Sequence, residues 1–373
     1  MANYLRNISI GQYRGISSLI VNNLNTVNII VGDNNSGKTS LLEAIYLLRA
    51  PHSFNNLLSA CRLRNTPSPL SPINLSPYES FLTIFPKVSQ SKGIYVSATG
   101  DSGPISVEVS GEVTTAIVDS EDLKQYPVSV RYAKERTILG SESPVFLGTL
   151  HSTIRTQQKD TPIRLMPISR ISTNISPRTA STNIVYLSPI SHITDSAFYS
   201  IVKSENYKDI CIQLIKLFDP DIEDLVYMPN DITGRAVEYI KSRRLGLMPL
   251  VTYGDGIKKV LSLANSIIEA KDGILLIDEI DTSIHYRFYK DIFRFLFKAA
   301  KKFNVQLFIT THSEEAIKEI LMTQDYGTST ADIPDPITVV TLRKDQSGNV
   351  RARSMTGFEV QSNQELFNFE VRL

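Results

Sequence analysis

The sequence has little cysteine, almost no excess charge and no long apolar run, and each absence excludes a class of protein. Its two cysteines, Cys61 and Cys211, stand far apart without a Cys-x-x-Cys pair or a Cys/His cluster. Neither a disulfide framework nor a zinc site is indicated, so we expect both thiols to be reduced and structural. No apolar run approaches the roughly 20 residues that cross a bilayer, and residues 1–11 lack the pattern of a signal peptide. We therefore expect a cytoplasmic protein without a membrane partner.

The charges of the chain nearly cancel. With 39 basic and 38 acidic residues the net charge is +1, which gives no global electrostatic signature of a nucleic-acid binder. Local basic clusters at 241–244 and 298–302 leave DNA binding open, although a solvated helix face is the favoured interpretation of each. The 42% hydrophobic content over 373 residues is enough for one large domain or two ordinary ones.

What the sequence does contain is a Gly-rich segment, Gly32–Thr39, with the spacing G-x-x-x-x-G-K-[ST]. A strand-like run precedes it and a helical run, 39–49, follows it, as a phosphate-binding P-loop requires. The glycines let backbone N–H groups cradle phosphates, Lys38 adds a charge of use in catalysis, and Thr39 offers its hydroxyl to Mg²⁺. The sequence thus predicts a site for ATP and Mg²⁺. Its predicted nucleotide-binding residues here are Gly32, Asn34, Asn35, Ser36, Gly37, Lys38, Thr39 and Ser40.

A second motif is the short apolar run Ile274–Ile277, which ends in the adjacent carboxylates Asp278 and Glu279. Continuous apolar runs of this length are typical of parallel strands buried on both faces. Downstream of a P-loop, Asp278 is predicted to be a metal ligand and Glu279 to polarise the attacking water as the catalytic base. A solvated turn is the alternative interpretation, and the P-loop makes it the weaker one.

The order of elements predicts an α/β fold. Residues 1–31 alternate as three strands, and after residue 253 a helix, a strand, a helix, a strand, a helix and a strand follow one another, which indicates a parallel sheet. The expected elements of this last part are a helix opened by 253–256, strands 274–277, 305–309 and 338–342, and helices 286–302 and 314–322.

The middle of the chain, 51–244, is less regular. Prolines and serines after residue 51 predict an irregular excursion, and alternation then predicts a hairpin of 94–96 with 105–109. Strands near 128–132 and 184–187 and a helix over 196–218 are also expected, and no chemistry is assigned to residues 115–200. We expect 1–50 with 245–373 to form the core, and 51–244 to be an insertion that partly belongs to the same lobe.

Four motifs in this order resemble those of the ABC-like, AAA-type ATPases of the OLD (overcoming lysogenization defect) superfamily. They are Gly32–Thr39, the signature 253–259, the stretch 277–281 with His285, and 310–313. The matching segments cover roughly residues 1–50 and 245–325. The resemblance implies a P-loop NTPase of ABC-like type, with a mixed parallel sheet, an N-terminal antiparallel β portion and a large insertion between the P-loop helix and the signature helix.

The resemblance also implies a homo-oligomer of at least two copies, because in that family the signature of one subunit closes on the nucleotide of another. A Gly-x-Gly at a helix start presents free N–H groups to an anion. A loop that only starts a helix is the alternative. The residues implied to contact a neighbour's γ-phosphate are Gly254, Asp255 and Gly256, with Lys258 or Lys259 adding charge.

Other residues acquire roles through the same resemblance. His312 matches the family's switch histidine, which senses the γ-phosphate; a structural histidine at a strand end is the alternative. Arg14 matches a basic position near the nucleotide in related ATPases. Asp281 is expected near the subunit interface, and His285 is compatible with a simple helix start.

Two departures narrow the interpretation. The signature reads Tyr-Gly-Asp-Gly rather than Ser-Gly-Gly, so coupling to a transporter is not expected, and the glutamine that commonly ligates Mg²⁺ in ABC-type sites cannot be placed. Only 61 residues follow His312, too few for the Toprim nuclease domain that OLD proteins often carry. The chain therefore resembles an ATPase without its own nuclease.

The favoured hypothesis is an ATP-driven oligomeric switch that resembles the ATPase subunit of the PARIS anti-phage system, whose partner is a separate Toprim-type nuclease. The run 37–45 also resembles RecF, so a DNA-repair ATPase that clamps DNA is the alternative, with affinity falling steeply with salt. A P-loop kinase is the weakest candidate, because Gly254 and His312 would have no role in it.

Overall fold

The computed structural model describes most of the chain. Within the described residues, no helix combines the length and the apolar composition that a membrane span requires. The described residues are 4–64, 75–86, 91–124, 137–169, 181–194, 198–203, 205–229, 236–324 and 335–367.

A six-stranded central sheet carries the motifs, in the order β15-β14-β3-β13-β12-β8. Five of its strands run parallel, and only β15 is antiparallel, paired with β14. The α/β fold with a mixed parallel sheet is thus confirmed. The strands are β3 (Val27–Gly32), β8 (Ile184–Leu187), β12 (Ile274–Ile277), β13 (Gln306–Thr310), β14 (Ile337–Lys344) and β15 (Val350–Thr356).

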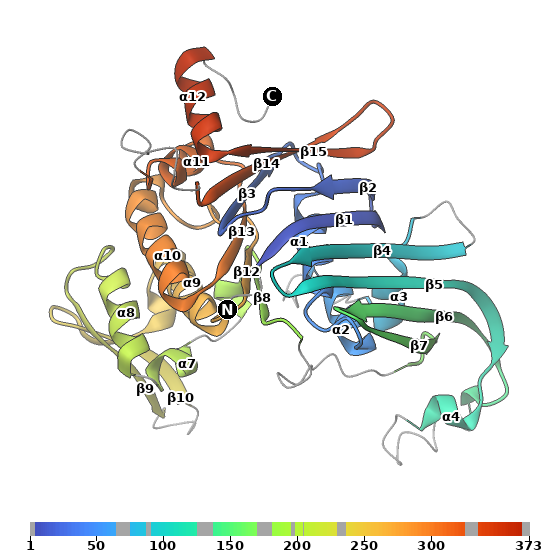
Figure 1. Ribbon diagram of the computed structural model, residues 1–373. Helices are drawn as coiled ribbons and strands as arrows, with labels where there is room; N and C mark the ends of the chain where they lie inside the picture. Colours follow the sequence, from blue (N-terminus) through green and yellow to red (C-terminus); the bar gives the residue numbers. More distant parts are fainter. Residues whose placement is uncertain are drawn as a thin grey trace.

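A second six-stranded sheet is antiparallel and lies beside the first (Figure 1), in the order β2-β1-β4-β5-β6-β7. It confirms the predicted N-terminal β portion and the predicted hairpin, which is formed by β4 and β5. The sequence did not predict β6 and β7. These strands are β1 (Leu5–Tyr13), β2 (Ile16–Val21), β4 (Ser91–Gly100), β5 (Gly103–Ile117), β6 (Glu142–Ile154) and β7 (Gln157–Leu165).

The central sheet is covered on both faces, which explains its continuous apolar runs. In β12, Ile274 and Leu276 pack with α1 (Lys38–Leu47) and the antiparallel sheet. Leu275 and Ile277 point the other way, into the cluster formed by α9 (Asp255–Glu269), α10 (Tyr289–Phe303) and α11 (Glu314–Leu321). Figure 1 shows these three helices on one side and the antiparallel sheet on the other.

A small antiparallel sheet, β11-β10-β9, lies next to the helical side. The predicted helix 196–218 is two helices, α7 (Phe198–Val202) and α8 (Glu205–Ile215). The predicted helix face at 241–244 is also wrong, because these residues lie at the end of β10 (Ala236–Ser242) and the turn to β11 (Gly246–Pro249). Their cations are paired with acidic residues of β9 (Ile222–Pro229) and the turn before it: Lys241 and Arg243 with Glu223, and Arg244 with Asp221.

The excursion after residue 51 is more regular than predicted, since its described residues include two helices with serine N-caps. These caps compensate for the poor helix signal of the Pro- and Ser-rich composition. The predicted strand at 128–132 lies outside the described residues, whereas the one at 184–187 is β8. The remaining elements are α2 (Phe54–Cys61), α3 (Pro77–Leu82), α4 (Ser120–Leu123), α6 (Ser191–Thr194), α12 (Gly357–Phe367), and the 3₁₀ turns η2 (Leu250–Thr252) and η3 (Tyr286–Phe288).

Candidate nucleotide site

The P-loop lies between β3 and α1, at the carboxyl end of the central sheet, and its backbone explains its glycines. Gly32 has φ +143°, and a Cβ there would meet the Leu342 carbonyl oxygen of β14 at 2.2 Å. Gly37 has φ +102° and caps α1 without a side-chain hydrogen bond. The first N–H groups of α1 therefore remain for an anion, and the helix dipole favours one there.

Lys38 is buried beneath the loop. Its ammonium donates to the backbone carbonyls of Gly32 and Asp33, at 2.8 Å each. These two bonds hold the charge at the centre of the loop. A phosphate group in the loop would lie against the same ammonium.

Asp278 follows β12 and is held from three sides. Its Oδ1 accepts from the hydroxyls of Thr310 at 2.6 Å and Thr39 at 3.3 Å, and its Oδ2 accepts from the hydroxyl of Tyr186 at 3.0 Å. The residue is 3% exposed. The contact with Thr39 brings together the two predicted metal ligands, which are 239 positions apart in the chain.

Glu279 has a strained backbone, with φ +49°. Non-glycine residues in this region cost about 1–3 kcal/mol, which the surrounding structure must offset. The Glu279 N–H donates to the Thr310 hydroxyl at 2.8 Å, and the Thr282 hydroxyl donates to its carboxylate at 3.3 Å. Thr310, at the end of β13, thus fixes both carboxylate residues.

These side chains face one cavity of about 260 Å³. The structure therefore brings the predicted base Glu279 and the predicted metal ligand Asp278, both after β12, and His312, after β13, to the P-loop. One lining residue, Arg64, was missed by the sequence analysis, because it lies in the Pro- and Ser-rich stretch that carried no motif. The lining residues are Asn34–Ser40, Arg64, Asp278, Glu279 and His312.

Arg14 is not among the lining residues of this cavity. It stands in the turn after β1, and its Nε lies 2.8 Å from the carboxylate of Glu43, which is fully buried on α1. Arg64 shares this carboxylate at 2.7 Å and also donates to Ser40 at 2.9 Å. The two guanidiniums oppose the effect of burial, which raises the pKa of Glu43. Arg64 thus lines the cavity, whereas Arg14 is linked to it only through the Glu43 carboxylate that both guanidiniums share.

The signature residues also lie outside the cavity. Gly254 is the N-cap of α9, and no described atom lies within 4 Å of where its Cβ would be. Asp255 and Gly256 begin the helix, and Lys258 pairs with Asp255 at 3.1 Å. The helix N-terminus is therefore open, as a site that receives an anion from outside would be.

Lys259, unlike Lys258, does not reach the surface around the signature. Its side chain is fully buried, and its ammonium donates to the Pro189 carbonyl at 3.2 Å, so the alternative that it adds charge at the signature is wrong. Burial lowers the pKa of Lys259 to about 8, while the nearby Asp278, Asp281 and Glu279 carboxylates oppose that shift. Lys259 therefore faces the acidic end of β12 from the helical side.

Two further residues after β12, Asp281 and His285, also have defined contacts. Asp281 accepts from the Thr311 hydroxyl at 2.6 Å, which ties the ends of β12 and β13 together. His285 is the N-cap of η3 and accepts from the Arg287 N–H at 3.4 Å, so it starts the helical segment as the simpler interpretation had it.

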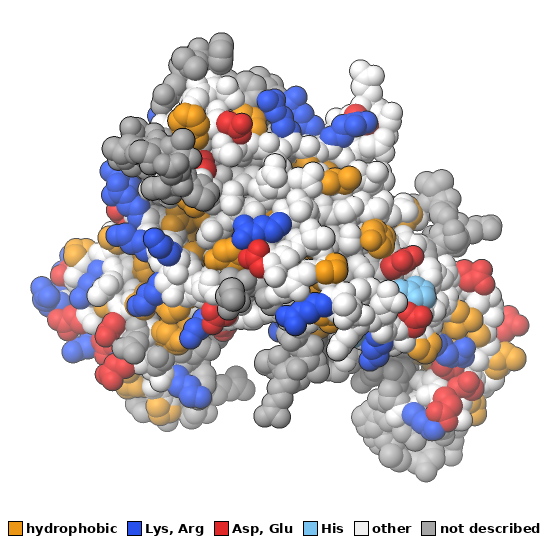
Figure 2. All heavy atoms as spheres, in the orientation of Figure 1, with side chains coloured by type: hydrophobic (Ala, Val, Ile, Leu, Met, Phe, Trp, Pro, Cys, Tyr) orange, Lys and Arg blue, Asp and Glu red, His pale blue; other side chains and the backbone are white. Residues whose placement is uncertain are grey.

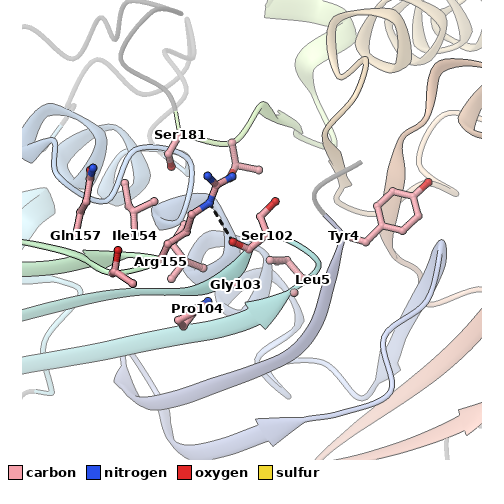
Figure 3. A pocket seen from close by; sticks show the side chains of 13 residues that line it. Tyr4, Leu5, Ser102, Gly103, Pro104, Ile154, Arg155, Gln157 and Ser181 are labelled. Carbon is pink, nitrogen blue, oxygen red and sulfur yellow. Dashed lines mark hydrogen bonds between the residues drawn. The ribbon is translucent and has the colours of Figure 1, made fainter. Parts of the chain in front are cut away.

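A larger cavity, of about 430 Å³, lies elsewhere, at the turns of the antiparallel sheet (Figure 3). Among the described residues that line it, only Arg155 has a charged side chain, and it donates to the Ser102 carbonyl at 3.1 Å. These described residues include no carboxylate, histidine or P-loop residue. Size alone would therefore mark the wrong cavity as the chemical site.

The residues at the P-loop fit Mg²⁺. Mg²⁺ prefers oxygen ligands and usually binds one or two protein ligands together with waters and substrate phosphates. Thr39 and Asp278 offer such oxygens next to the phosphate loop. The described residues hold no cluster of three or more His, Cys, Asp or Glu that would form an all-protein metal site.

Comparisons with known proteins agree with this geometry. The family model described as "AAA domain, putative AbiEii toxin, Type IV TA system" matches residues 27–318, well over half of the chain. The chain belongs to this AAA family. An ATP/GTP phosphatase of Helicobacter pylori (strain ATCC 700392 / 26695) is 22% identical over 355 residues, which cover 87% of this AAA protein and 90% of the relative.

Two further similarities are more limited. RecF of Shewanella frigidimarina (strain NCIMB 400), a DNA replication and repair protein, is 44% identical, but over 61 residues only, 16% of this chain and 17% of RecF. The SMC head bound to the C-winged helix domain of ScpA has a TM-score of 0.51 at 12% identity and covers 95% of this chain and 98% of that one. This AAA protein is thus an ATPase with an ABC-like P-loop fold.

Proposed function

We propose that this AAA protein is an ATP-driven switch in which the signature of one copy closes the nucleotide cavity of another. The observation that carries the proposal is the separation of the two halves. The P-loop, Asp278, Glu279 and His312 share one cavity, whereas Gly254 lies at an open helix end outside it. A site of this kind is incomplete within one chain.

The chemistry follows from the positions of the residues. The N–H groups of the P-loop and Lys38 bind the phosphates, and Thr39 with Asp278 would hold Mg²⁺, which neutralises phosphate charge when it is bound. Glu279 orients the attacking water, and His312 contacts the γ-phosphate from the end of β13. The N–H groups at Gly254 of the second copy stabilise the negative charge that develops in the transition state.

The first test is the mass of the protein in solution, with and without Mg-ATP. We expect Glu279→Gln, which binds but does not hydrolyse ATP, to accumulate an assembly of at least two copies that the native protein forms only transiently. A monomer under all conditions, with normal phosphate release by Glu279→Gln, would contradict both the composite site and the role of Glu279.

A mixing experiment tests the composite site more directly. Lys38→Ala keeps an intact signature, and Gly254→Tyr keeps an intact P-loop. We expect each variant alone to be nearly inactive and their mixture to regain ATPase activity, because the signature of the first completes the cavity of the second. A mixture no more active than its parts would show that the site is built within one chain.

The biological role that we propose is that of an OLD-type standalone ATPase that controls a separate effector, such as a Toprim-type nuclease, in anti-phage defence. The support is the order of the four motifs and the match to a family whose description names a putative AbiEii toxin. The test is phage challenge of cells that carry the gene with its chromosomal neighbours. Protection that is unchanged by Glu279→Gln and by Lys38→Ala would contradict an ATP-controlled role.

A RecF-like DNA clamp is the second candidate, which the local similarity to RecF favours. It requires a basic surface. On the face shown in Figure 2, acidic and basic side chains are interspersed over the lower part of the molecule. Binding of duplex DNA by Glu279→Gln with Mg-ATP, falling steeply between low and high salt, would favour the clamp over the effector switch.

A further inference from the structure

Tyr186 contacts the acidic end of β12 from a neighbouring strand. β8 runs parallel to β12, with Tyr186 opposite Leu276, two residues before Asp278. Two strand residues span about 6.6 Å, a distance that the long side chain of tyrosine can cover along the strand. Its hydroxyl reaches the Asp278 Oδ2 at 3.0 Å. A serine or threonine at this position would be too short.

The hydroxyl completes the hydrogen bonding of the carboxylate. Thr39 and Thr310 both bind Oδ1, so among the described side chains that hold the Asp278 carboxylate only Tyr186 binds Oδ2. A carboxylate held at both oxygens cannot rotate about its last bond. The oxygen that faces Thr39 therefore stays where a metal beside the P-loop would need it.

The ring of Tyr186 is itself held in place. Tyr46 of α1 packs against it edge to face, with centroids 6.4 Å apart. The phenolic hydroxyl of tyrosine can donate a hydrogen bond, and the Asp278 carboxylate accepts it.

We propose that Tyr186 is a positioning residue that fixes the Asp278 carboxylate for the Mg²⁺ of the bound nucleotide. This inference rests on the proposed nucleotide site and adds a residue from a strand without any ATPase motif. Tyr186 does not touch the reacting atoms. It acts by limiting the orientations of the one carboxylate that shares the metal with Thr39.

The experiment is a Mg²⁺ titration at fixed ATP in the Glu279→Gln background, followed by thermal unfolding rather than by turnover. We expect Tyr186→Phe to raise the Mg²⁺ concentration at half-maximal stabilisation several-fold, while the melting temperature without Mg²⁺ changes little. Thr310→Val, which removes the donor to the other oxygen, should raise it as well. The matched control is Tyr46→Phe, whose hydroxyl bonds Arg49 and not Asp278.

Each outcome decides the inference. An unchanged midpoint in Tyr186→Phe would overturn it, and so would an equal shift in Tyr46→Phe, which would indicate general loosening around the two rings. If the parent protein showed no Mg²⁺-dependent stabilisation by ATP, the proposed nucleotide site itself would fail. The two failures are therefore distinguishable.

Discussion

The nucleotide cavity and the signature end of α9 differ in how completely they are built. In the cavity, Asp278 and Glu279 are buried or half-buried and held by several hydroxyls and a backbone bond. At the signature, a Cβ built on Gly254 would have no described neighbour within 4 Å, and Asp255 makes a half-exposed ion pair with Lys258. The predicted catalytic half is thus preorganised, whereas the signature half stands open, as the proposed contact with a second copy requires.

The largest expected effect of a substitution is on ATP hydrolysis, and it concerns a residue of the cavity. Glu279→Gln should lower kcat for ATP about 10²–10⁴-fold, because a positioned general base typically contributes that much. The affinity for ATP should change little, since the P-loop is intact. Phosphate release and binding of a fluorescent ATP analogue measure the two. Glu269→Gln, at the exposed end of α9, is the matched control and should behave as the native protein.

The signature half should respond differently. Gly254→Tyr keeps a permitted backbone, because φ is −64°, and its side chain projects into open space. ATP binding by the isolated chain should persist, while hydrolysis should fall about a hundredfold, the usual effect of losing preorganised donors to a developing charge. Hydrolysis equal to that of the native protein would show that Gly254 has no part in the site.

Lys259 lies on the signature helix α9 and near the carboxylates of Asp278 and Glu279. Its burial predicts a dependence of stability on pH. In the folded protein its pKa is about 8, whereas in the unfolded chain it is about 10.4. Between these values the unfolded chain binds more protons, so stability should rise with pH, by up to about 3 kcal/mol. Lys259→Met should lose this rise. Chemical unfolding at pH 7 and pH 9.5 measures the difference, and Lys271→Met, an exposed lysine near the same helix, is the control.

The smallest effect concerns two glycines with different roles. Gly32→Ala should destabilise the fold by about 2 kcal/mol or more, because it combines a positive φ with a backbone clash. Gly254→Ala meets neither obstacle and should leave the free energy of unfolding nearly unchanged. Urea unfolding of the two variants compares them. Equal destabilisation would contradict the distinction between Gly32, which the backbone geometry requires, and Gly254, which leaves the helix N-terminus open to an anion.

Much of the central sheet could be predicted, and the reasons are local. Ile274–Ile277 is apolar throughout because both faces of β12 are covered, and the P-loop has a spacing that few other structures need. The middle of the chain could not be predicted in the same way. The strands β6 and β7 form a hairpin whose residues are largely polar, so they lack a continuous apolar run, and the capping serine of α3 does not stand out in its Ser-rich surroundings.

The candidate site shows the same division. Lys38, Asp278 and Glu279 were predicted by their motifs, and the structure places them around one cavity. Tyr186 and Arg64 were not, because neither belongs to a motif and each acts through a partner distant in sequence. Arg14 was predicted to lie near the nucleotide, and the structure places it behind Glu43, outside the lining of the cavity.

The sequence by itself determined the chemistry of this protein: a phosphate loop, a carboxylate pair after a strand, a second Gly-rich helix start and a histidine after the next strand. These depend on short-range backbone geometry, which spacing records. Only the tertiary structure decided which of two adjacent lysines is fully buried, which residue holds Asp278 from the neighbouring strand, and that the signature lies outside the cavity. Such relations arise when strands and helices distant in sequence pack together, and spacing along the chain does not record packing.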